Sequence, residues 1–294
     1  MTAGQGEDRP SLLAGLIGRG IQGSRTPAMH EREGAAQGLR YVYRRIDLEP
    51  LALGPDALPD LLLSAERMGF DGLNITFPCK QAVISLLHGL SDDARALGAV
   101  NTVVLRGGRR VGHNTDGYGF TENFRRGLGD VRRDRVVQMG AGGGGAAVAH
   151  ALAGLGVGRL AIFDTDHRRA EELAAGIEAR FGAGRASAGG DLAEALAAAD
   201  GVVNATPVGM ASIPGTSVPA SLLRPGLWVA DIVYVPLETE LLRRARAIGC
   251  RTLDGGGMAV FQAAEAFRLF TGLAPDVERM RRHFASMDAA PAAG

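Results

Sequence analysis

Lys80 is the first residue whose type suggests chemistry, because it is the only lysine of the chain. The sequence has 294 residues, and every other member of its 32 lysine and arginine residues is an arginine. A lysine can lose its proton and act as a base when its surroundings lower its pKa, whereas an arginine stays protonated. Chance retention in a chain with strong codon bias is the alternative. The position directly behind "NITFPC" favours a proton-transfer role.

A glycine-rich turn predicts a second site. In "VVQMGAGGGGAAVAHAL", Gly140, Gly142 and Gly145 have the spacing G-x-G-x-x-G after an apolar strand and at the start of an alanine-rich helix. Glycines let the backbone approach a pyrophosphate, and the helix N-terminus offers unpaired N–H groups and a favourable dipole. The motif alone can be a plain turn in a glycine-rich chain. Its strand and helix context predicts a dinucleotide site.

Asp164 ends the next predicted strand, "LAIFD". A carboxylate there accepts hydrogen bonds from both ribose hydroxyls of NAD and repels the 2′-phosphate of NADP. A helix cap is the alternative role, which Asp166 could serve equally. His167, Arg168 and Arg169 form a counterargument, since a cation could hold a phosphate, although they also fit a solvated helix face. The pattern favours NAD, with NADP as a poorer alternative.

A nicotinamide cofactor implies hydride transfer, and hydride transfer from an alcohol needs a group that takes the hydroxyl proton. Polar residues at predicted strand ends are the candidates: Lys80, Asp116, His113, Asn74, Asn101 and Asn114. A carboxylate such as Asp116 beside Lys80 would hold the ammonium form and orient it.

The elements around Lys80 predict an alternating α/β domain. We expect strands in "LLAGLIG", "YVYRRIDL" and "FDGLNIT", a helix in "PDALPDLLLSAERMG", and a hairpin through Gly107 and Gly108. A helix in "KQAVISLLHGL" is expected to carry Lys80 in its first turn, where the helix dipole disfavours a cation. About ten residues at the N-terminus are expected to form a disordered tail.

Strands and helices alternate again in the second part of the chain, which predicts a parallel, doubly wound sheet. The fold class is therefore α/β with two domains. Residues 1–117 form a substrate-binding domain and residues 118–257 a dinucleotide-binding domain of the Rossmann type. The last segment, 258–294, reads as two helices that pack back on the first domain.

Composition points to a small-molecule partner. The formal net charge is +0, so no long-range attraction to nucleic acid or an anionic membrane is expected. Two cysteines, no signal peptide and no long apolar run predict a cytoplasmic protein without a membrane span or a metal site. Monomer and homodimer stay open.

Eight segments together resemble the shikimate dehydrogenase family. They are "SRTPAMHE", "NITFPCK", "GAVNTVV", "GHNTDGYGF", "GAGGGGAA", "NATPVGM", "DIVYVPLETELLRRARAIGC" and "DGGGMAVFQAAEAFRLFTG". The resemblance runs from about residue 12 to residue 284 in the family's order. It implies an oxidoreductase that interconverts the 3-hydroxyl of a cyclohexene or cyclohexane carboxylic acid with the ketone, using NAD or NADP.

The resemblance also implies roles for single residues. It makes Lys80 and Asp116 the catalytic pair. For the substrate, it implies that Ser24 and Thr26 hold the carboxylate, that Thr76, Asn101 and Gln262 bind ring hydroxyls, and that Tyr234 lies near the substrate. The implied cofactor-binding residues are Gly140, Ala141, Gly142, Gly143, Gly144, Gly145, Asp164, Arg168, Asn204, Thr206, Ile232 and Gly255.

Two departures from the family pattern favour a quinate/shikimate dehydrogenase that uses NAD. Most members that use shikimate have two serines where this chain has Ser24 and Thr26, and an Asn-Arg-Thr type NADP signature where it has Asp164. Quinate carries an extra hydroxyl beside its carboxylate, at the end that residues 24 and 26 would contact. The alternatives are an NADP-dependent biosynthetic shikimate dehydrogenase, an enzyme for an amino-substituted analogue, and a non-catalytic nucleotide-sensing protein. Cys79 is expected to be a packing residue.

Overall fold

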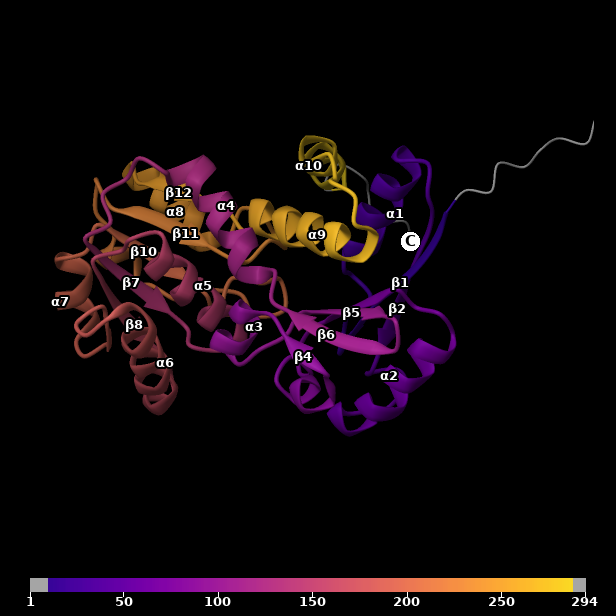
Figure 1. Ribbon diagram of the computed structural model, residues 1–294. Coiled ribbons are helices and arrows are strands. Elements are labelled where there is room, and N and C mark those ends of the chain that lie inside the picture. Colours follow the sequence, from indigo (N-terminus) through magenta and orange to yellow (C-terminus); the bar gives the residue numbers. More distant parts are fainter. Residues whose placement is uncertain (1–9, 288–294) are drawn as a thin grey trace, which may run out of the picture. The chain divides into compact units, whose positions relative to one another are not determined.

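The structure is a computed structural model that describes residues 10–287, and the predicted N-terminal tail lies outside this range. It divides the chain into two compact units (Figure 1). One unit combines the chain up to Thr115 with the segment from Ala263 onward, and the other spans Asp116–Gln262. The predicted divisions were 117/118 and 257/258, so helix α9 (Gly256–Thr271) belongs partly to each unit. The predicted two-domain α/β fold is confirmed.

The first unit has a six-stranded sheet of order β2-β1-β3-β5-β6-β4. Its strands are β1 (Ser11–Gly18), β2 (Arg40–Asp47), β3 (Gly72–Ile75), β4 (Gly89–Leu90), β5 (Thr102–Arg106) and β6 (Arg109–His113). Strand β5 is antiparallel to β3 and β6, and the other neighbouring pairs are parallel. The predicted hairpin joins β5 and β6 through Gly107 and Gly108, whose φ angles of 58° and 70° suit glycine.

Both faces of this sheet are covered. Along β1, Ile17 packs with helix α2 (Leu58–Arg67), whereas Ala14 and Leu16 pack with Phe267 of α9. Alternate residues of a strand point to opposite faces, so a continuous apolar run marks a strand that is buried on both sides. The remaining helices of this unit are α1 (Thr26–Ala36), α3 (Asp92–Leu97) and α10 (Val277–Ser286).

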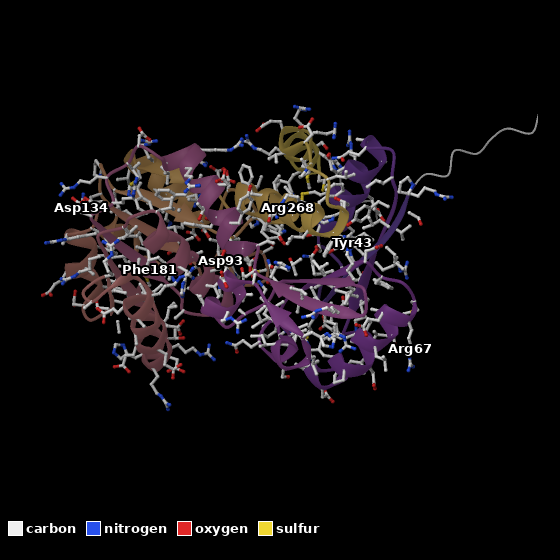
Figure 2. All side chains as sticks on the ribbon, viewed as in Figure 1. Tyr43, Arg67, Asp93, Asp134, Phe181 and Arg268 are labelled. Atoms are coloured by element: carbon white, nitrogen blue, oxygen red, sulfur yellow. The ribbon has the colours of Figure 1, made fainter. Side chains whose placement is uncertain are left out.

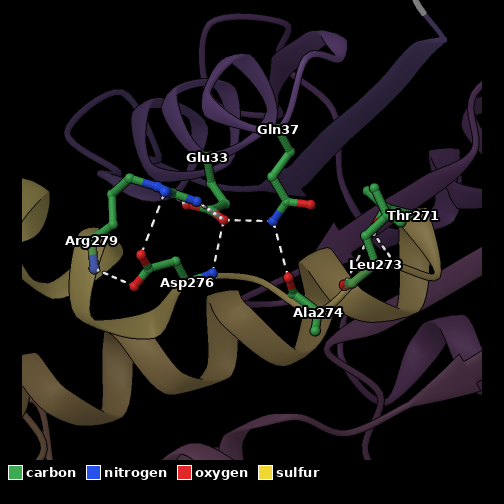
Figure 3. Close-up of polar contacts among 7 residues, drawn as sticks. All are labelled: Glu33, Gln37, Thr271, Leu273, Ala274, Asp276 and Arg279. Carbon is green, nitrogen blue, oxygen red and sulfur yellow. Dashed lines mark hydrogen bonds and ion pairs between the residues drawn. The ribbon is translucent and has the colours of Figure 1, made fainter.

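Helix α1 was not predicted, and α10 holds it in place (Figure 3). The side chain of Glu33 on α1 is fully buried, and its two oxygens accept hydrogen bonds from Nε and Nη2 of Arg279 at 2.8 and 2.7 Å. The backbone N–H of Asp276 also donates to Glu33, and Gln37 donates to Glu33 and to the carbonyl of Ala274. These contacts attach the C-terminal helix to the segment that begins at Thr26.

The expected α-helix after Lys80 is wrong. Lys80 lies in a turn, and only a short 3₁₀ helix, Ala82–Leu86, follows it. The carbonyl oxygen of Lys80 accepts the N–H of Val100 at 2.9 Å, and the N–H of Ile84 donates to Gln81 instead, in a 3₁₀ contact. An α-helix would need the carbonyl of Lys80 for Ile84, so pairing with the neighbouring segment prevents it. The expected dipole penalty on Lys80 therefore does not apply.

The second unit has an all-parallel sheet of order β12-β11-β10-β7-β8-β9. Its strands are β7 (Arg135–Met139), β8 (Arg159–Phe163), β9 (Ala186–Ala188), β10 (Gly201–Asn204), β11 (Trp228–Asp231) and β12 (Arg251–Leu253). Its helices are α4 (Asp116–Leu128), α5 (Gly143–Gly154), α6 (His167–Phe181), α7 (Leu192–Ala197) and α8 (Glu240–Ile248). The strand order reverses between β7 and β10, the position where doubly wound sheets bind ligands.

Candidate active site

The glycine-rich turn after β7 requires glycine at two of its predicted positions. Gly140 has a φ of 100°, and a Cβ there would lie 2.7 Å from the carbonyl oxygen of Ala205. A Cβ on Gly145 would lie 2.3 Å from the carbonyl oxygen of Gly140. The first and last glycines of the motif therefore allow the turn itself to close.

The middle of the same turn fits a phosphate. Gly142 is the N-cap of α5 and provides no side-chain cap, and the first turn of α5 contains no acidic residue. A Cβ on Gly142 would meet no atom within 4 Å, so space lies open beside the backbone. Uncapped N–H groups at a helix N-terminus attract anions, and a pyrophosphate suits this position.

Asp164 follows β8 and is bonded to the turn. Its Oδ2 accepts the N–H of Ala141 at 2.7 Å, and its Oδ1 accepts the N–H of Asp166 at 2.9 Å. Burial alone would raise the pKa of Asp164, but these backbone hydrogen bonds outweigh burial and lower the pKa below its usual value. The side chain of Asp166 accepts the N–H of Arg168 and caps α6, so the cap role is filled without Asp164.

Three further predicted cofactor residues, Thr206, Ile232 and Gly255, lie around the same turn. The Cγ2 of Thr206 would lie 2.9 Å from a Cβ on Gly140, and the Cδ1 of Ile232 would lie 3.2 Å from a Cβ on Gly144. A Cβ on Gly255 would lie 2.3 Å from the carbonyl oxygen of Ile232. The structure thus brings together residues that the sequence places on four strand ends. Arg168 is exposed on the first turn of α6.

Three predicted substrate-site residues meet in the first unit. Thr76 follows β3 and donates its N–H to Ile17 of β1 at 2.9 Å. Asn101, directly before β5, accepts the N–H of Ile75 at 2.8 Å through its backbone carbonyl. The carbonyl of Lys80 accepts the N–H of the residue before Asn101. Thr76, Lys80 and Asn101 therefore lie at the same end of the first sheet, where β3 ends and β5 begins.

Cys79, beside Lys80, is a packing residue as expected. It has no exposed surface and belongs to the hydrophobic cluster on the α2 side of the sheet. Burial raises the pKa of its thiol, so the thiolate form is disfavoured.

A chain of buried hydrogen bonds orients the amide of Asn101. Its Oδ1 accepts the hydroxyl of Thr102 at 2.9 Å and the N–H of Thr115 at 2.8 Å, and its Nδ2 donates to Oγ1 of Thr115 at 3.0 Å. Asn74 donates to Oγ1 of Thr102 and accepts the hydroxyl of Tyr43 at 2.7 Å (Tyr43 is labelled in Figure 2). The side-chain oxygen Oδ1 of Asn101 therefore accepts its hydrogen bonds from groups of the protein itself.

The segment that carries Ser24 and Thr26 depends on Asp47, which the sequence reasoning missed. Asp47 ends β2, and its carboxylate accepts the backbone N–H groups of residues 20 and 21 at 2.9 and 3.1 Å. Arg45 donates to the carbonyl of Ser24 at 2.9 Å, and Thr26 begins α1. An acidic residue at the end of "YRRID" was the signal in the sequence.

The remaining predicted residues belong to the second unit. Asp116 begins α4, Tyr234 follows β11, and Gln262 lies on α9. A Cβ on Gly119 would lie 2.9 Å from the backbone nitrogen of Gln262, so α4 and α9 are in close contact. Lys80 lies in the first unit, and its pairing with Asp116 stays a prediction.

Among residues 10–287, no group of three or more His, Cys, Asp or Glu side chains is arranged to hold a metal ion. Within the same range, no helix has the length and apolar character needed to cross a membrane.

Comparisons with known proteins cover almost the whole chain. Residues 16–103 match the model of the shikimate dehydrogenase substrate binding domain, and residues 255–283 match that of the shikimate 5'-dehydrogenase C-terminal domain. The shikimate dehydrogenase (NADP(+)) of Streptomyces avermitilis is 60% identical over 94% of this chain and 96% of its own length. The quinate/shikimate dehydrogenase (NAD(+)) of Corynebacterium efficiens is 55% identical over 94% of this chain and 99% of its own length.

A solved structure has the same fold in both units. Quinate dehydrogenase from Corynebacterium glutamicum in complex with NAD superposes with a TM-score of 0.89 and 52% identity. The match covers 95% of this chain and 100% of that chain.

Proposed function

The chain belongs to the shikimate dehydrogenase family, and from this premise we propose that it is a quinate/shikimate dehydrogenase with a preference for NAD. The reaction is the reversible oxidation of the C3 hydroxyl of quinate, and of shikimate, to the ketone. The relatives whose names specify quinate and NAD support this assignment.

One observation carries the choice of cofactor. The carboxylate of Asp164 accepts a hydrogen bond from the backbone N–H of Ala141 in the glycine-rich turn, with 2.7 Å between nitrogen and oxygen. The hydrogen bonds that lower its pKa keep it negative at neutral pH. A negative charge there accepts hydrogen bonds from ribose hydroxyls and repels a 2′-phosphate. The cofactor is held by the turn from Gly140 to Gly145, with Asn204, Thr206, Ile232 and Gly255 beside it.

Bound nicotinamide supplies the hydride acceptor for the oxidation. Lys80 and Asp116 exchange the proton of the C3 hydroxyl, and the carboxylate keeps the lysine oriented. Asn101 contacts a ring hydroxyl, and hydrogen bonds with Thr102 and Thr115 hold its side-chain amide in one orientation. Thr76, Gln262 and Tyr234 complete the substrate site.

The substrate carboxylate binds at Ser24 and Thr26. The β-methyl group of Thr26 restricts its side-chain rotamer, which shapes the pocket for the puckered ring of quinate. This feature supports a preference for quinate and leaves shikimate as a second substrate.

A second candidate function is an NADP-dependent biosynthetic shikimate dehydrogenase. The relative from Streptomyces avermitilis, whose name specifies NADP(+), favours it. Arg168, exposed on the first turn of α6, offers a cation for the additional phosphate. A non-catalytic nucleotide-sensing protein would have no use for an acid–base pair.

An assay of four combinations, quinate or shikimate with NAD or NADP, tests the proposal. We expect the highest kcat/KM for quinate with NAD, and a higher value for NAD than for NADP with either acid. A higher value for shikimate with NADP would support the biosynthetic alternative. Absence of turnover in all four, with intact binding of NADH, would support a sensing role.

We further propose a cytoplasmic enzyme, monomeric or homodimeric, whose partners are small molecules. The formal charge of +0 supports the absence of nucleic-acid and membrane partners.

A further inference from the structure

Asp231, at the end of β11, is a buried carboxylate that the proposed reaction does not use. Only 2% of its surface is exposed. Its Oδ1 accepts the side-chain Nδ2 of Asn204 at 2.9 Å and the N–H of Val233 at 3.0 Å. Its Oδ2 accepts the hydroxyl of Thr239 at 2.7 Å. None of these partners carries a charge, so hydrogen bonds alone compensate for the burial of the negative charge of Asp231.

The carboxylate fixes the orientation of the Asn204 amide. A carboxylate can only accept, so Nδ2 of Asn204 must face Asp231. The second hydrogen of Nδ2 goes to the carbonyl of Val208 at 2.9 Å. Oδ1 of Asn204 is then directed toward Thr206, from which it accepts the backbone N–H at 3.2 Å and the hydroxyl at 2.7 Å. The turn from residue 204 to residue 208 therefore depends on Asp231.

Thr239 connects a third segment to the same carboxylate. Its hydroxyl oxygen accepts the N–H of Leu242 and caps α8, so its hydrogen is available for Asp231. Asp231 thus links the turn after β10, the turn after β11 and the start of α8.

Both turns contact the glycine-rich turn. A Cβ on Gly140 would lie 2.7 Å from the carbonyl oxygen of Ala205, inside the turn that follows Asn204. Ile232, the residue after Asp231, lies against Gly144. A shift of either turn would therefore change the walls of the cofactor site.

We propose that Asp231 is a positioning residue that holds the turns after β10 and β11 in the geometry that binds the nicotinamide cofactor. This inference rests on the proposed function, because it assigns the cofactor to that edge of the second sheet. Asp231 acts through Asn204 and Ile232 and does not contact the reacting atoms.

The free-energy cost of this carboxylate supports a role beyond folding. Burial raises the pKa of Asp231 to about 6, against the hydrogen bonds from Val233, Thr239 and Asn204. The protein therefore keeps a charge that the fold disfavours at neutral pH.

Two pairs of variants test the inference on the full chain. Asp231→Ala removes every acceptor, and Asp231→Asn removes the charge but keeps one oxygen. Thr239→Val removes the hydroxyl with little change of shape, and Thr239→Ser restores it. The measurements are the Kd of NADH by fluorescence titration, the KM for each substrate, kcat and Tm.

We expect the KM for NAD and the Kd of NADH to rise about tenfold or more in Asp231→Ala, which loses all the hydrogen bonds of the side chain. In Asp231→Asn and Thr239→Val, which lose fewer, both constants should rise about three- to tenfold. The KM for the hydroxy acid should change less than twofold. Thr239→Ser should bind NADH like the wild type. Asp231→Asn should bind the cofactor more weakly although its Tm is equal or higher, a combination that loss of folding does not produce.

An unchanged Kd of NADH and an unchanged KM for NAD in Asp231→Asn and Thr239→Val would overturn the inference. If Asp231→Ala does not fold, the test rests on these two variants. Equal weakening of cofactor and hydroxy acid, with a lower Tm, would also overturn it. Failure of the proposed function has a different signature, which is seen in the wild type: turnover that is highest with shikimate and NADP, or binding of NADH without turnover. The titration would still report the role of Asp231.

Discussion

Asp164→Asn should remove most of the discrimination against NADP while it keeps part of the support for the glycine-rich turn. The carboxylate has two functions in the structure: it carries a negative charge, and it accepts the N–H groups of Ala141 and Asp166 at 2.7 and 2.9 Å. The oxygen of an asparagine can retain one of these hydrogen bonds. Alanine retains neither, so the two variants separate the charge from the support of the turn.

The size of the effect follows from Coulomb's law. A 2′-phosphate carries about −1.5 to −2 charges at neutral pH. At about 5 Å from a half-buried carboxylate, with an effective dielectric constant of about 40–80, the repulsion is about 1.5–3 kcal/mol. This repulsion corresponds to about a 10- to 150-fold change in the ratio of kcat/KM for NAD and NADP.

The assay is a comparison of kcat/KM for both cofactors with one hydroxy acid at saturation. Asp164→Asn should shift the ratio toward NADP mainly by improving NADP, whereas Asp164→Ala should also raise the KM for NAD. Asp166→Asn is the matched control, because it removes a charge two residues away and asparagine still caps a helix. A ratio in Asp164→Asn within twofold of the wild type would refute the electrostatic reasoning.

The remaining predictions concern proton transfer and stability. Lys80→Arg keeps the positive charge but should lower kcat at least about 100-fold, because an arginine does not release its proton; unchanged kcat would show that charge alone suffices. Arg279→Met should lower the free energy of unfolding by about 3 kcal/mol in a urea titration, because Glu33 is left buried without its cation. The double variant with Glu33→Gln should recover most of this stability. No recovery would contradict the buried charge of Glu33 as the cause. Burial raises the pKa of Asp231 from 3.8 to about 6, so the folded state binds this proton more tightly than the unfolded state. The free energy of unfolding should therefore fall by about 3 kcal/mol as the pH rises from about 4 to above 6. Asp231→Asn should lack this slope and unfold at a higher Tm at pH 7, and a wild-type slope in that variant would contradict the assignment.

The second sheet was largely predictable because its signals are local. Apolar runs that end in glycine or in a polar residue mark β7, β8, β10 and β11, and the glycine spacing identifies the turn after β7. The missed strand β9 has the sequence "ASA", which carries no strand signal, and it exists by pairing with β8. Propensity is weak evidence for so short an edge strand.

The first unit was less predictable because long-range contacts decide its elements. Helix α1 has little separation of polar and apolar faces, and it is held by Arg279 on α10. Gly34 within it would be a poor helix former by sequence, but a Cβ there would lie 2.5 Å from Tyr41, so its absence permits the helix to pack. The failed helix after Lys80 has the same kind of cause, since the contact with Val100 connects positions that the local sequence does not relate.

The same local turn occurs at three acidic residues, of which the sequence singled out only Asp164 and gave no role to Asp47 or Asp231. Asp47, Asp164 and Asp231 each end a parallel strand or directly follow one, and each accepts the backbone N–H two residues ahead. For Asp164 and Asp231 this turn is visible in the sequence as an aspartate after an apolar run, whereas Asp47 follows the mixed segment "YVYRRI". What differs is the partner of the other oxygen: a loop before α1, the glycine-rich turn, or Thr239. The tertiary fold supplies that partner, so the same side chain supports a loop at two positions and faces the proposed cofactor site at the third.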